Sequence, residues 1–265
     1  MTVFFFDVSF YQINLNYYLL FIIYNNIMKH VRLYQNISLK INKKLVLDEY
    51  ASCHLAKALR FLQGQEITLF NGDGRNYLAT IVRVKNYCEV EIHTCTHNNS
   101  ESQLNITLVQ GITKGEKMDF LTQKSVELGV NRIIPIFSEY CVIHLQDEKL
   151  QKRMERWQKI IIGACEQSGR SVIPSLVLAM NFEDFVNTKF GNGFILHHRA
   201  KYSLLEMNKV NQATIIIGPE GGLSDQEIAN ANEQGAQSLV LGSRILRAET
   251  ASLATIANMQ LLWGS

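Results

Sequence analysis

Two β-branched runs that each stop at a glycine constrain this chain most. They are Thr214–Ile217 and Ser238–Leu241, and each is followed by a loop and then by a helix signal. In the first helix signal, Ser224 precedes Glu227 by three positions, which is the spacing of a capping box. Strand, loop and helix in this order bring backbone amides and carbonyls to the carboxyl edge of a parallel sheet, where open α/β sheets bind ligands.

From residue 104 onward, strand patterns alternate with helix patterns. Gly129 follows the first helix pattern, where a C-cap glycine is expected. The longest helix pattern has Met154, Trp157 and Ile161 on one face and basic residues on another. This alternation predicts a parallel α/β sheet. The expected elements are strands at Ile106–Gln110, Val130–Phe137 and Gly193–His197, and helices at Met118–Leu128 and from Leu150 to Ala164.

Residues 28–97 have a different, β-rich pattern. A strong turn signal at Asn71–Gly74 joins two short strand patterns, Glu66–Phe70 and Tyr77–Val84, and a third, Glu89–Thr96, alternates apolar with polar residues. A short helix is expected over Ser52–Leu62. We therefore predict a small β-barrel domain at 28–97, a polar linker at 98–103 and an α/β domain at 104–265.

Residues 1–27 do not resemble either domain. Asp7 is their one charged residue, and they lack the basic segment and the cleavage site of a signal peptide. Their apolar centre, Tyr17–Tyr24, is shorter than the roughly 20 residues that span a membrane. We expect the natural start to be Met28 and residues 1–27 to be a non-native extension; the alternative is a weak membrane-binding or partner-binding tail.

Charge and cysteine content exclude little but favour one compartment. The chain has 26 Lys and Arg against 24 Asp and Glu, and the basic excess lies in residues 28–99. This excess mildly favours an anionic partner such as nucleic acid, although on charge alone an ordinary solvated surface is the better explanation. The 5 cysteines are scattered, so we expect neither a disulfide framework nor a zinc site. This pattern fits a protein of the reducing cytoplasm. His197 and His198 are adjacent and point to opposite faces of a strand, so no metal is expected there.

The glycine loops differ from the common phosphate-binding loops. Residues 218–222 read Gly-Pro-Glu-Gly-Gly, which matches neither the P-loop nor the dinucleotide fingerprint. Glu220 would also place a negative charge against a pyrophosphate. The ligand is therefore expected to be neutral or cationic overall, with an adenosine part contacted by backbone groups.

The motifs resemble those of the SPOUT superfamily of S-adenosylmethionine-dependent RNA methyltransferases. Within it, the chain is similar to the 16S rRNA (uracil-1498-N3) methyltransferase family, ribosomal small-subunit methyltransferase E, along nearly all of residues 28–263. Cys141 and Ala248 depart from the family's usual serine and threonine, and residues 1–27 have no counterpart. The segments that carry the resemblance are residues 54–60, 72–74, 114–118, 124–129, 166–170, 218–222 and 241–251.

The resemblance implies a fold, a reaction and partners. The fold is a knotted parallel-sheet SPOUT methyltransferase domain, preceded by a small PUA-like β-barrel that holds RNA. The reaction is methylation of uridine N3 in 16S rRNA of the small ribosomal subunit, with S-adenosyl-L-methionine as methyl donor and no metal. The protein would form a homodimer through the knot domain and would not associate with a membrane.

The resemblance also assigns residues. Arg247 would stabilise charge on the uracil carbonyls, Glu220 would orient the ligand or act as base, and Arg170 would reach the uridine or its phosphate. The two arginines each have a structural alternative: a salt bridge to Glu249 for Arg247, and a helix C-terminal charge for Arg170. The expected donor pocket is Leu196, Gly218, Gly221, Gly222, Leu241, Gly242, Ile245 and Leu246, and the expected RNA contacts are Arg32, Lys57, Arg60 and Arg75.

Two other functions stay open at this point. One is a sister SPOUT enzyme that methylates tRNA, against which residues 247–251 argue. The other is a non-catalytic RNA-binding or ribosome-assembly protein that keeps the fold. Binding of the methyl donor would separate this last function from the enzymes.

Overall fold

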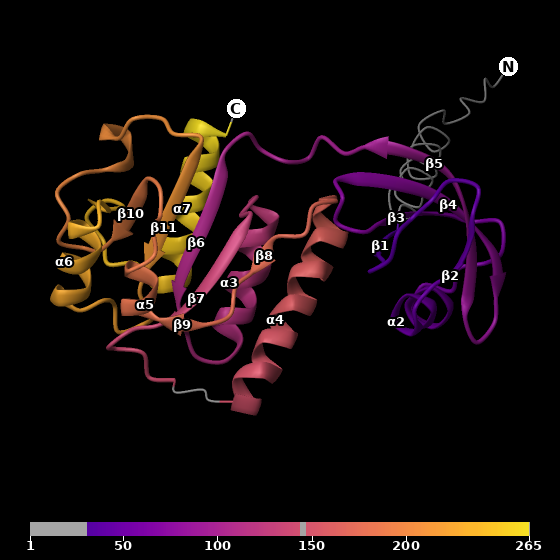
Figure 1. The fold of residues 1–265 in the computed structure, drawn as a ribbon, viewed down its shortest axis with the longest axis horizontal. Helices are drawn as coiled ribbons and strands as arrows, with labels where there is room; N and C mark the ends of the chain where they lie inside the picture. Colours follow the sequence, from indigo (N-terminus) through magenta and orange to yellow (C-terminus); the bar gives the residue numbers. More distant parts are fainter. Residues whose placement is uncertain (1–30, 144–146, 265) are drawn as a thin grey trace, which may run out of the picture. The chain divides into compact units, whose positions relative to one another are not determined.

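The computed structural model describes residues 31–143 and 147–264 (Figure 1). The chain divides into two compact units between His97 and Asn98. The expected extension at 1–27 lies outside the described residues. Asn98 donates a hydrogen bond to the carbonyl of Gly169 at 2.7 Å, so the predicted linker begins on the second unit.

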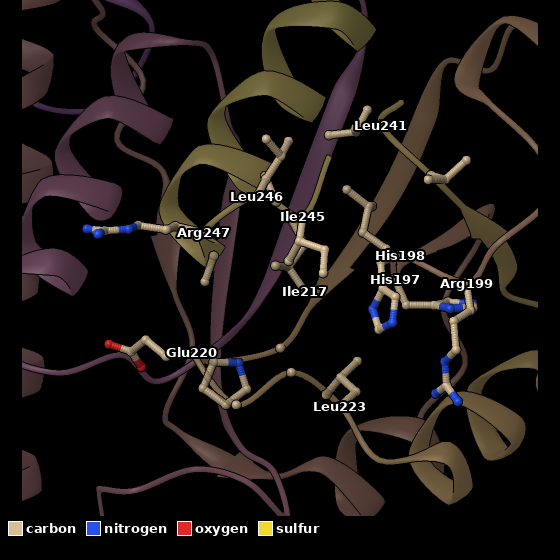
Figure 2. A pocket seen from close by; sticks show the side chains of 18 of the residues that line it. His197, His198, Arg199, Ile217, Glu220, Leu223, Leu241, Ile245, Leu246 and Arg247 are labelled. Carbon is tan, nitrogen blue, oxygen red and sulfur yellow. The ribbon is translucent and has the colours of Figure 1, made fainter. Parts of the chain in front are cut away.

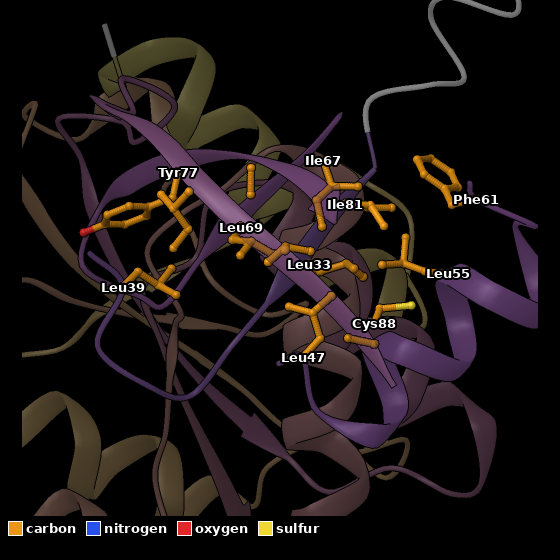
Figure 3. Packing of buried hydrophobic residues seen from close by; sticks show 14 residues of the cluster. Leu33, Leu39, Leu47, Leu55, Phe61, Ile67, Leu69, Tyr77, Ile81 and Cys88 are labelled. Carbon is orange, nitrogen blue, oxygen red and sulfur yellow. The ribbon is translucent and has the colours of Figure 1, made fainter. Parts of the chain in front are cut away.

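The first unit is a five-stranded sheet in the order β1-β3-β4-β5-β2. Strands β1 and β3 are parallel, and the other neighbours are antiparallel. Alternate residues of β4 are buried, including Tyr77, Ala79 and Ile81, and they meet Leu33 and Leu55 in one apolar core (Figure 3). The strands are β1 Arg32–Tyr34, β2 Lys44–Val46, β3 Glu66–Phe70, β4 Arg75–Val84 and β5 Cys88–His97.

The helical segment of the first unit is shorter than predicted and irregular. Helix α2 spans Glu49–Cys53 and begins at Asp48, whose side chain accepts a hydrogen bond from the Ala51 amide at 2.7 Å. It continues as a π-helical turn, η1, at His54–Ala58. Arg60 then has a left-handed backbone with φ 53°, which ends the helix before Leu62.

The second unit confirms the predicted parallel α/β sheet. Within its described residues, the strands run in the order β12-β10-β11-β6-β7-β8, β9 also pairs with β7, and all pairs are parallel. The strands are β6 Asn105–Gly111, β7 Arg132–Phe137, β8 Ser175–Leu176, β9 Met180–Asn181, β10 Gly193–Leu196, β11 Gln212–Ile217 and β12 Gln237–Leu239. The helices are α3 Glu116–Glu127, α4 Asp147–Ser168, α5 Phe182–Val186, the 3-10 turn η2 Leu204–Glu206, α6 Asp225–Glu233 and α7 Ala248–Trp263.

The strand order places a ligand site at one edge of this sheet. Strands β6 and β11 are neighbours, but the chain leaves β6 toward β7 and leaves β11 toward β12, in opposite directions. Ligands bind outside the carboxyl ends of strands at such a switch point. The loops that follow β6, β10, β11 and β12 therefore meet at this edge.

Helix α4 packs as predicted, and helix α7 packs against α3 and β11. Helix α4 buries Met154, Trp157 and Ile161, as its apolar stripe predicted. Helix α7 buries Ile256, whereas Leu261, near its C-terminal end, is 78% exposed. Among the described residues, no helix is long and apolar enough to cross a membrane.

Candidate active site and family membership

A pocket of about 690 Å³ lies at the carboxyl ends of β10, β11 and β12 (Figure 2). Its walls come from the loop at 218–223, the segment 239–248 and the residues that follow β10. Of the eight residues expected to bind the donor, all except Gly242 line it. The residues that the resemblance assigned to the donor pocket therefore lie around one cavity, apart from Gly242.

The loop after β11 requires glycine because backbone segments approach closely. A Cβ on Gly218 would lie 2.6 Å from the carbonyl carbon of Gly222, and one on Gly221 would lie 2.7 Å from Cβ of Tyr140. Gly222 itself has φ 78°, a left-handed conformation that side chains disfavour. The compact turn leaves main-chain groups, rather than side chains, to form this wall.

A buried glutamine fastens this loop to the rest of the unit. The Gln110 side chain, at the end of β6, donates to the carbonyls of Gly111 at 3.0 Å and Gly218 at 3.3 Å. Its oxygen accepts a hydrogen bond from the Ser252 hydroxyl on α7 at 2.7 Å. The predicted capping box at the start of α6 is confirmed, since Ser224 and Glu227 hydrogen-bond each other's amides. The loop is thus held at both ends.

The segment after β12 supplies the apolar wall. Leu241, Ile245 and Leu246 line the pocket, and Ile245 is 81% exposed despite being large and apolar. Gly242 has φ 80°, so it shapes this turn without lining the cavity. Single exposed apolar side chains are common, but this one lies beside other apolar groups in a pocket that a ligand would cover.

Glu220 is held as an ionised carboxylate. Its Oε1 accepts hydrogen bonds from the Lys114 amide at 3.1 Å and from the Lys117 ammonium at 3.3 Å. Burial alone would raise the pKa of Glu220, but these bonds and one from its own amide outweigh burial and lower that pKa. A carboxylate stabilised in this way is a poor proton acceptor near neutral pH. Its contacts instead hold the loop after β6 against the loop after β11.

His197 is the site residue that sequence reasoning missed. Both ring nitrogens are buried and have no hydrogen-bond partner within the described residues, although the ring lines the pocket. Burial, with the nearby charges of Arg199 and His198, lowers the pKa of His197, so the ring is neutral at neutral pH. A neutral imidazole offers one donor and one acceptor. The sequence signal for this role is its position directly after β10, at the carboxyl end of a strand of the parallel sheet.

Arg247 lies immediately before α7 with an exposed side chain. Within the described part of the chain it forms no ion pair, so the alternative salt bridge to Glu249 is not present there. Figure 2 shows Arg247 and Glu220 on one side of the pocket and His197 on the other. Charged side chains therefore lie on both sides of the pocket, with Arg247 and Glu220 on one side and Arg199 beside His197 on the other, and apolar groups lie between them.

The structure does not bring Arg170 to this pocket. Its side chain is 4% exposed and forms a two-pronged pair with Glu101, at 2.9 Å from Nε and 2.6 Å from Nη2. Its Nη1 donates to the carbonyls of Val126 at 2.9 Å and Val130 at 2.7 Å, at the C-terminal end of α3. This corrects the expectation that Arg170 reaches the uridine: the guanidinium is buried and engaged by groups that fix α3.

The expected RNA contacts all lie in the first unit. Arg32 donates to Asn76 Oδ1 at 3.0 Å, and its guanidinium carbon lies 5.1 Å from the centroid of the Phe70 ring. Arg75 begins β4, while Lys57 and Arg60 are exposed on the α2–η1 segment. The unit thus carries several cations at its surface, which is the property that a phosphate backbone requires.

Comparisons with known families define the class. A family model described as "RNA methyltransferase domain" matches residues 100–260, and one described as "RNA methyltransferase PUA domain" matches residues 47–92. The first match covers more than half of the chain and includes the whole pocket. The protein is an RNA methyltransferase by family, with the PUA region in its first unit.

Individual relatives narrow this class. "Ribosomal RNA small subunit methyltransferase E" of Buchnera aphidicola is 34% identical over 237 residues, which cover 88% of this chain and 96% of that one. The solved protein of that name from Neisseria gonorrhoeae, bound to S-adenosyl methionine, is 38% identical with a TM-score of 0.84, and the match covers 89% of this chain and 98% of that one. A Legionella pneumophila protein solved with bound SAM is 39% identical with a TM-score of 0.86, and the match covers 89% and 99%. The chain belongs to the ribosomal RNA small subunit methyltransferase E family, and its two-unit fold is SPOUT-like.

Proposed function

We propose that this protein methylates N3 of a uridine in 16S rRNA of the small ribosomal subunit, with S-adenosyl-L-methionine as donor. One observation carries the proposal: two glycine loops and the end of β10 enclose a pocket that has charged side chains on two sides and apolar groups between them. Relatives at 38% and 39% identity were solved with this donor bound. The choice of uridine rests on the family resemblance.

The pocket suits an adenosine-bearing ligand. Leu196, Leu241 and Leu246 supply apolar contact for a flat ring, and the turns at Gly218 and Gly242 keep side chains away from main-chain hydrogen-bonding groups. Ile245 would become covered on binding. His197 offers a hydrogen bond that no described group satisfies, so we add it to the proposed donor site.

Methyl transfer to the uracil requires a second contribution from the protein, which is stabilisation of negative charge on the base. N3–H of uracil is a weak acid, and its proton passes to solvent before transfer, which leaves an anion with charge on the carbonyl oxygens. The bond from N3 to the methyl group then forms as the bond from methyl to sulfonium breaks, the donor leaves as a neutral thioether, and a site with little water favours this neutralisation of charge. We infer that Arg247 stabilises the uracil carbonyls before transfer; in support, its side chain lines the pocket and its cation is unpaired among the described residues.

Glu220 is proposed as a positioning residue. Its three hydrogen bonds and lowered pKa disfavour a role as general base, whereas they connect the loop after β6 to the loop after β11. Lys117, which pairs with Glu220, also lines the pocket and brings a second cation to the side of the pocket where Glu220 lies. Alignment of donor and acceptor would depend on this pair.

We further propose a homodimer through the second unit and a cytoplasmic location beside the ribosome. The dimer is supported by exposed large apolar side chains on two helices that pack together: Phe120 on α3 and Leu261 on α7. In the first unit, Arg32, Lys57, Arg60 and Arg75 would contact RNA phosphates and provide affinity rather than sequence choice. Knotting of the chain stays a prediction from the family resemblance.

The test is transfer from labelled S-adenosylmethionine to small ribosomal subunits that lack the modification, with the product nucleoside identified by mass spectrometry. 3-Methyluridine in 16S rRNA is expected. Transfer only to tRNA would favour the sister enzyme. Donor binding without transfer to either RNA would contradict the proposed acceptor, and absence of donor binding would favour a non-catalytic RNA-binding protein.

A further inference from the structure

The first unit has an aromatic pair at its surface that the donor site does not use. The rings of Tyr50 and His54 lie one helical turn apart, with centroids 6.1 Å apart and planes inclined by 1°. Tyr50 is 68% exposed, whereas Ala51 and Leu55, from the same turns, are in the core. Neither ring has a hydrogen-bond partner within residues 31–143 and 147–264. The exposed Tyr50 ring and the partly buried His54 ring therefore lie parallel to each other at the surface.

The backbone beneath this pair is unusual at two adjacent places. His54 begins the π-helical turn η1, and Arg60 has φ 53°. A π-helical turn is rare, and a left-handed arginine costs about 1–2 kcal/mol. Both kinds of feature occur preferentially where function holds them in place.

Two cations accompany the aromatic pair. Lys57 and Arg60 are exposed, and neither forms an ion pair with any described residue. Glu49, the acid of this segment, stands in the first turn of α2, where it complements the helix N-terminus. The segment thus combines flat aromatic surface with unpaired positive charge. A single nucleic-acid strand can use both, because its bases stack on aromatic rings and its phosphates pair with cations.

We propose that Tyr50 and His54 form a stacking platform for an unpaired RNA base, with Lys57 and Arg60 contacting the phosphates beside it. This inference rests on the proposed function, since it describes how the substrate RNA is held. Double-stranded RNA hides its base faces, so the platform selects unpaired nucleotides. Sequence choice among bases is not expected, because every base has a π-face.

The experiment measures binding of the full chain to a fluorescent single-stranded RNA and to the same strand annealed to its complement. Tyr50→Ala is expected to weaken single-strand binding about five-fold to about a hundred-fold and to change duplex binding much less. Tyr50→Phe should restore the affinity, since it keeps the ring. The matched control is Tyr87→Ala, because Tyr87 is 54% exposed on the same unit but lies in the turn between β4 and β5.

The phosphate part has its own readout. Lys57→Gln should lower single-strand and duplex affinity similarly and reduce the slope of log affinity against log salt by about 0.7 for the single strand. Equal single-strand binding by Tyr50→Ala and the wild type would overturn the platform, and so would an equal loss by Tyr50→Ala and Tyr87→Ala. A loss confined to intact ribosomal subunits, with free RNA unaffected, would also overturn it and assign the patch to a protein partner.

Failure of this inference can be told from failure of the proposed function. Wild-type protein that binds no donor and transfers no methyl group would refute the reaction, whereas the stacking measurement needs no donor. Thermal unfolding of each variant shows whether a lost affinity reflects a lost fold. Tyr50 is exposed, so its variants are expected to unfold as the wild type does.

Discussion

Gly111→Ala should distort the loop after β11, which forms one wall of the donor pocket. Gly111 ends β6, and a Cβ there would lie 2.3 Å from the backbone nitrogen of Pro219, 2.4 Å from its Cδ and 2.7 Å from the carbonyl carbon of Gly218. Atoms of this kind do not approach closer than roughly 3.4 Å without strain. The loop would therefore have to move by about 1 Å, and it is the loop that forms the wall of the pocket.

The magnitude follows from overpacking. Insertion of a methyl group into a packed site costs typically about 1–3 kcal/mol. The upper end is expected here, because the nearest atoms are backbone and proline ring atoms rather than a flexible side chain. A shift of about 1 Å in a site that positions reactants can also lower the rate roughly a hundred-fold. Gly111→Ala should therefore lose both stability and transfer activity.

Gly163→Ala is the matched control. Gly163 lies inside α4, and a Cβ there would meet nothing within 4 Å. The same substitution should stabilise the protein by about 0.5–1 kcal/mol, because alanine loses less backbone entropy in a helix. Urea unfolding and calorimetric donor titration of both variants provide the comparison. Unchanged stability and donor affinity in Gly111→Ala would refute the reasoning that β6 and the glycine loop are locked together.

Four further predictions concern named side chains. Arg247→Ala should lower kcat by about a hundred-fold to a thousand-fold in single-turnover assays while calorimetric donor affinity stays the same; a full rate would remove Arg247 from the mechanism. Arg170→Met should destabilise the protein by about 3 kcal/mol in urea, because it leaves Glu101 partly buried and unpaired, and a loss of uridine affinity with full stability would restore its expected catalytic role. Because burial lowers the pKa of His197 in the folded state, its neutral form contributes stability that is complete above about pH 6.5 and declines as the pH falls below that value. His197→Gln should therefore flatten the fall in unfolding free energy below about pH 6.5, and it should weaken donor binding. Arg60→Gly should be more stable than Arg60→Ala by about 1 kcal/mol, since glycine accepts the left-handed backbone; equal unfolding free energies would show that this position is not strained.

Local patterns predicted most elements of both units. Strand β3 has the predicted bounds, Glu66–Phe70, because alternation and turn residues are properties of neighbouring positions. The capping box at Ser224 was predicted for the same reason. The short strands β8 and β9 were not, since two residues carry too little pattern and pair only with β7.

Roles of side chains were predicted less well than their neighbourhood. The motif at 166–170 marked Arg170 as notable but could not say which groups surround it. Its partner Glu101 is 69 positions away and lay in the segment expected to be a linker. For His197 the local sequence, a histidine followed by His198, does not show that the fold buries the ring and that no described residue hydrogen-bonds it.

The sequence by itself determined the two-unit organisation, the parallel sheet and the glycine loops, because each rests on residues close together in the chain. The tertiary structure alone decided which of these residues share a pocket, that Arg170 fixes α3, and that Leu261 faces outward. The hydrogen bond from Ser252 to Gln110 spans 142 positions, and the contact of Gly111 with Pro219 is likewise between distant segments. Such contacts depend on the order in which strands pair, and no local periodicity records that order.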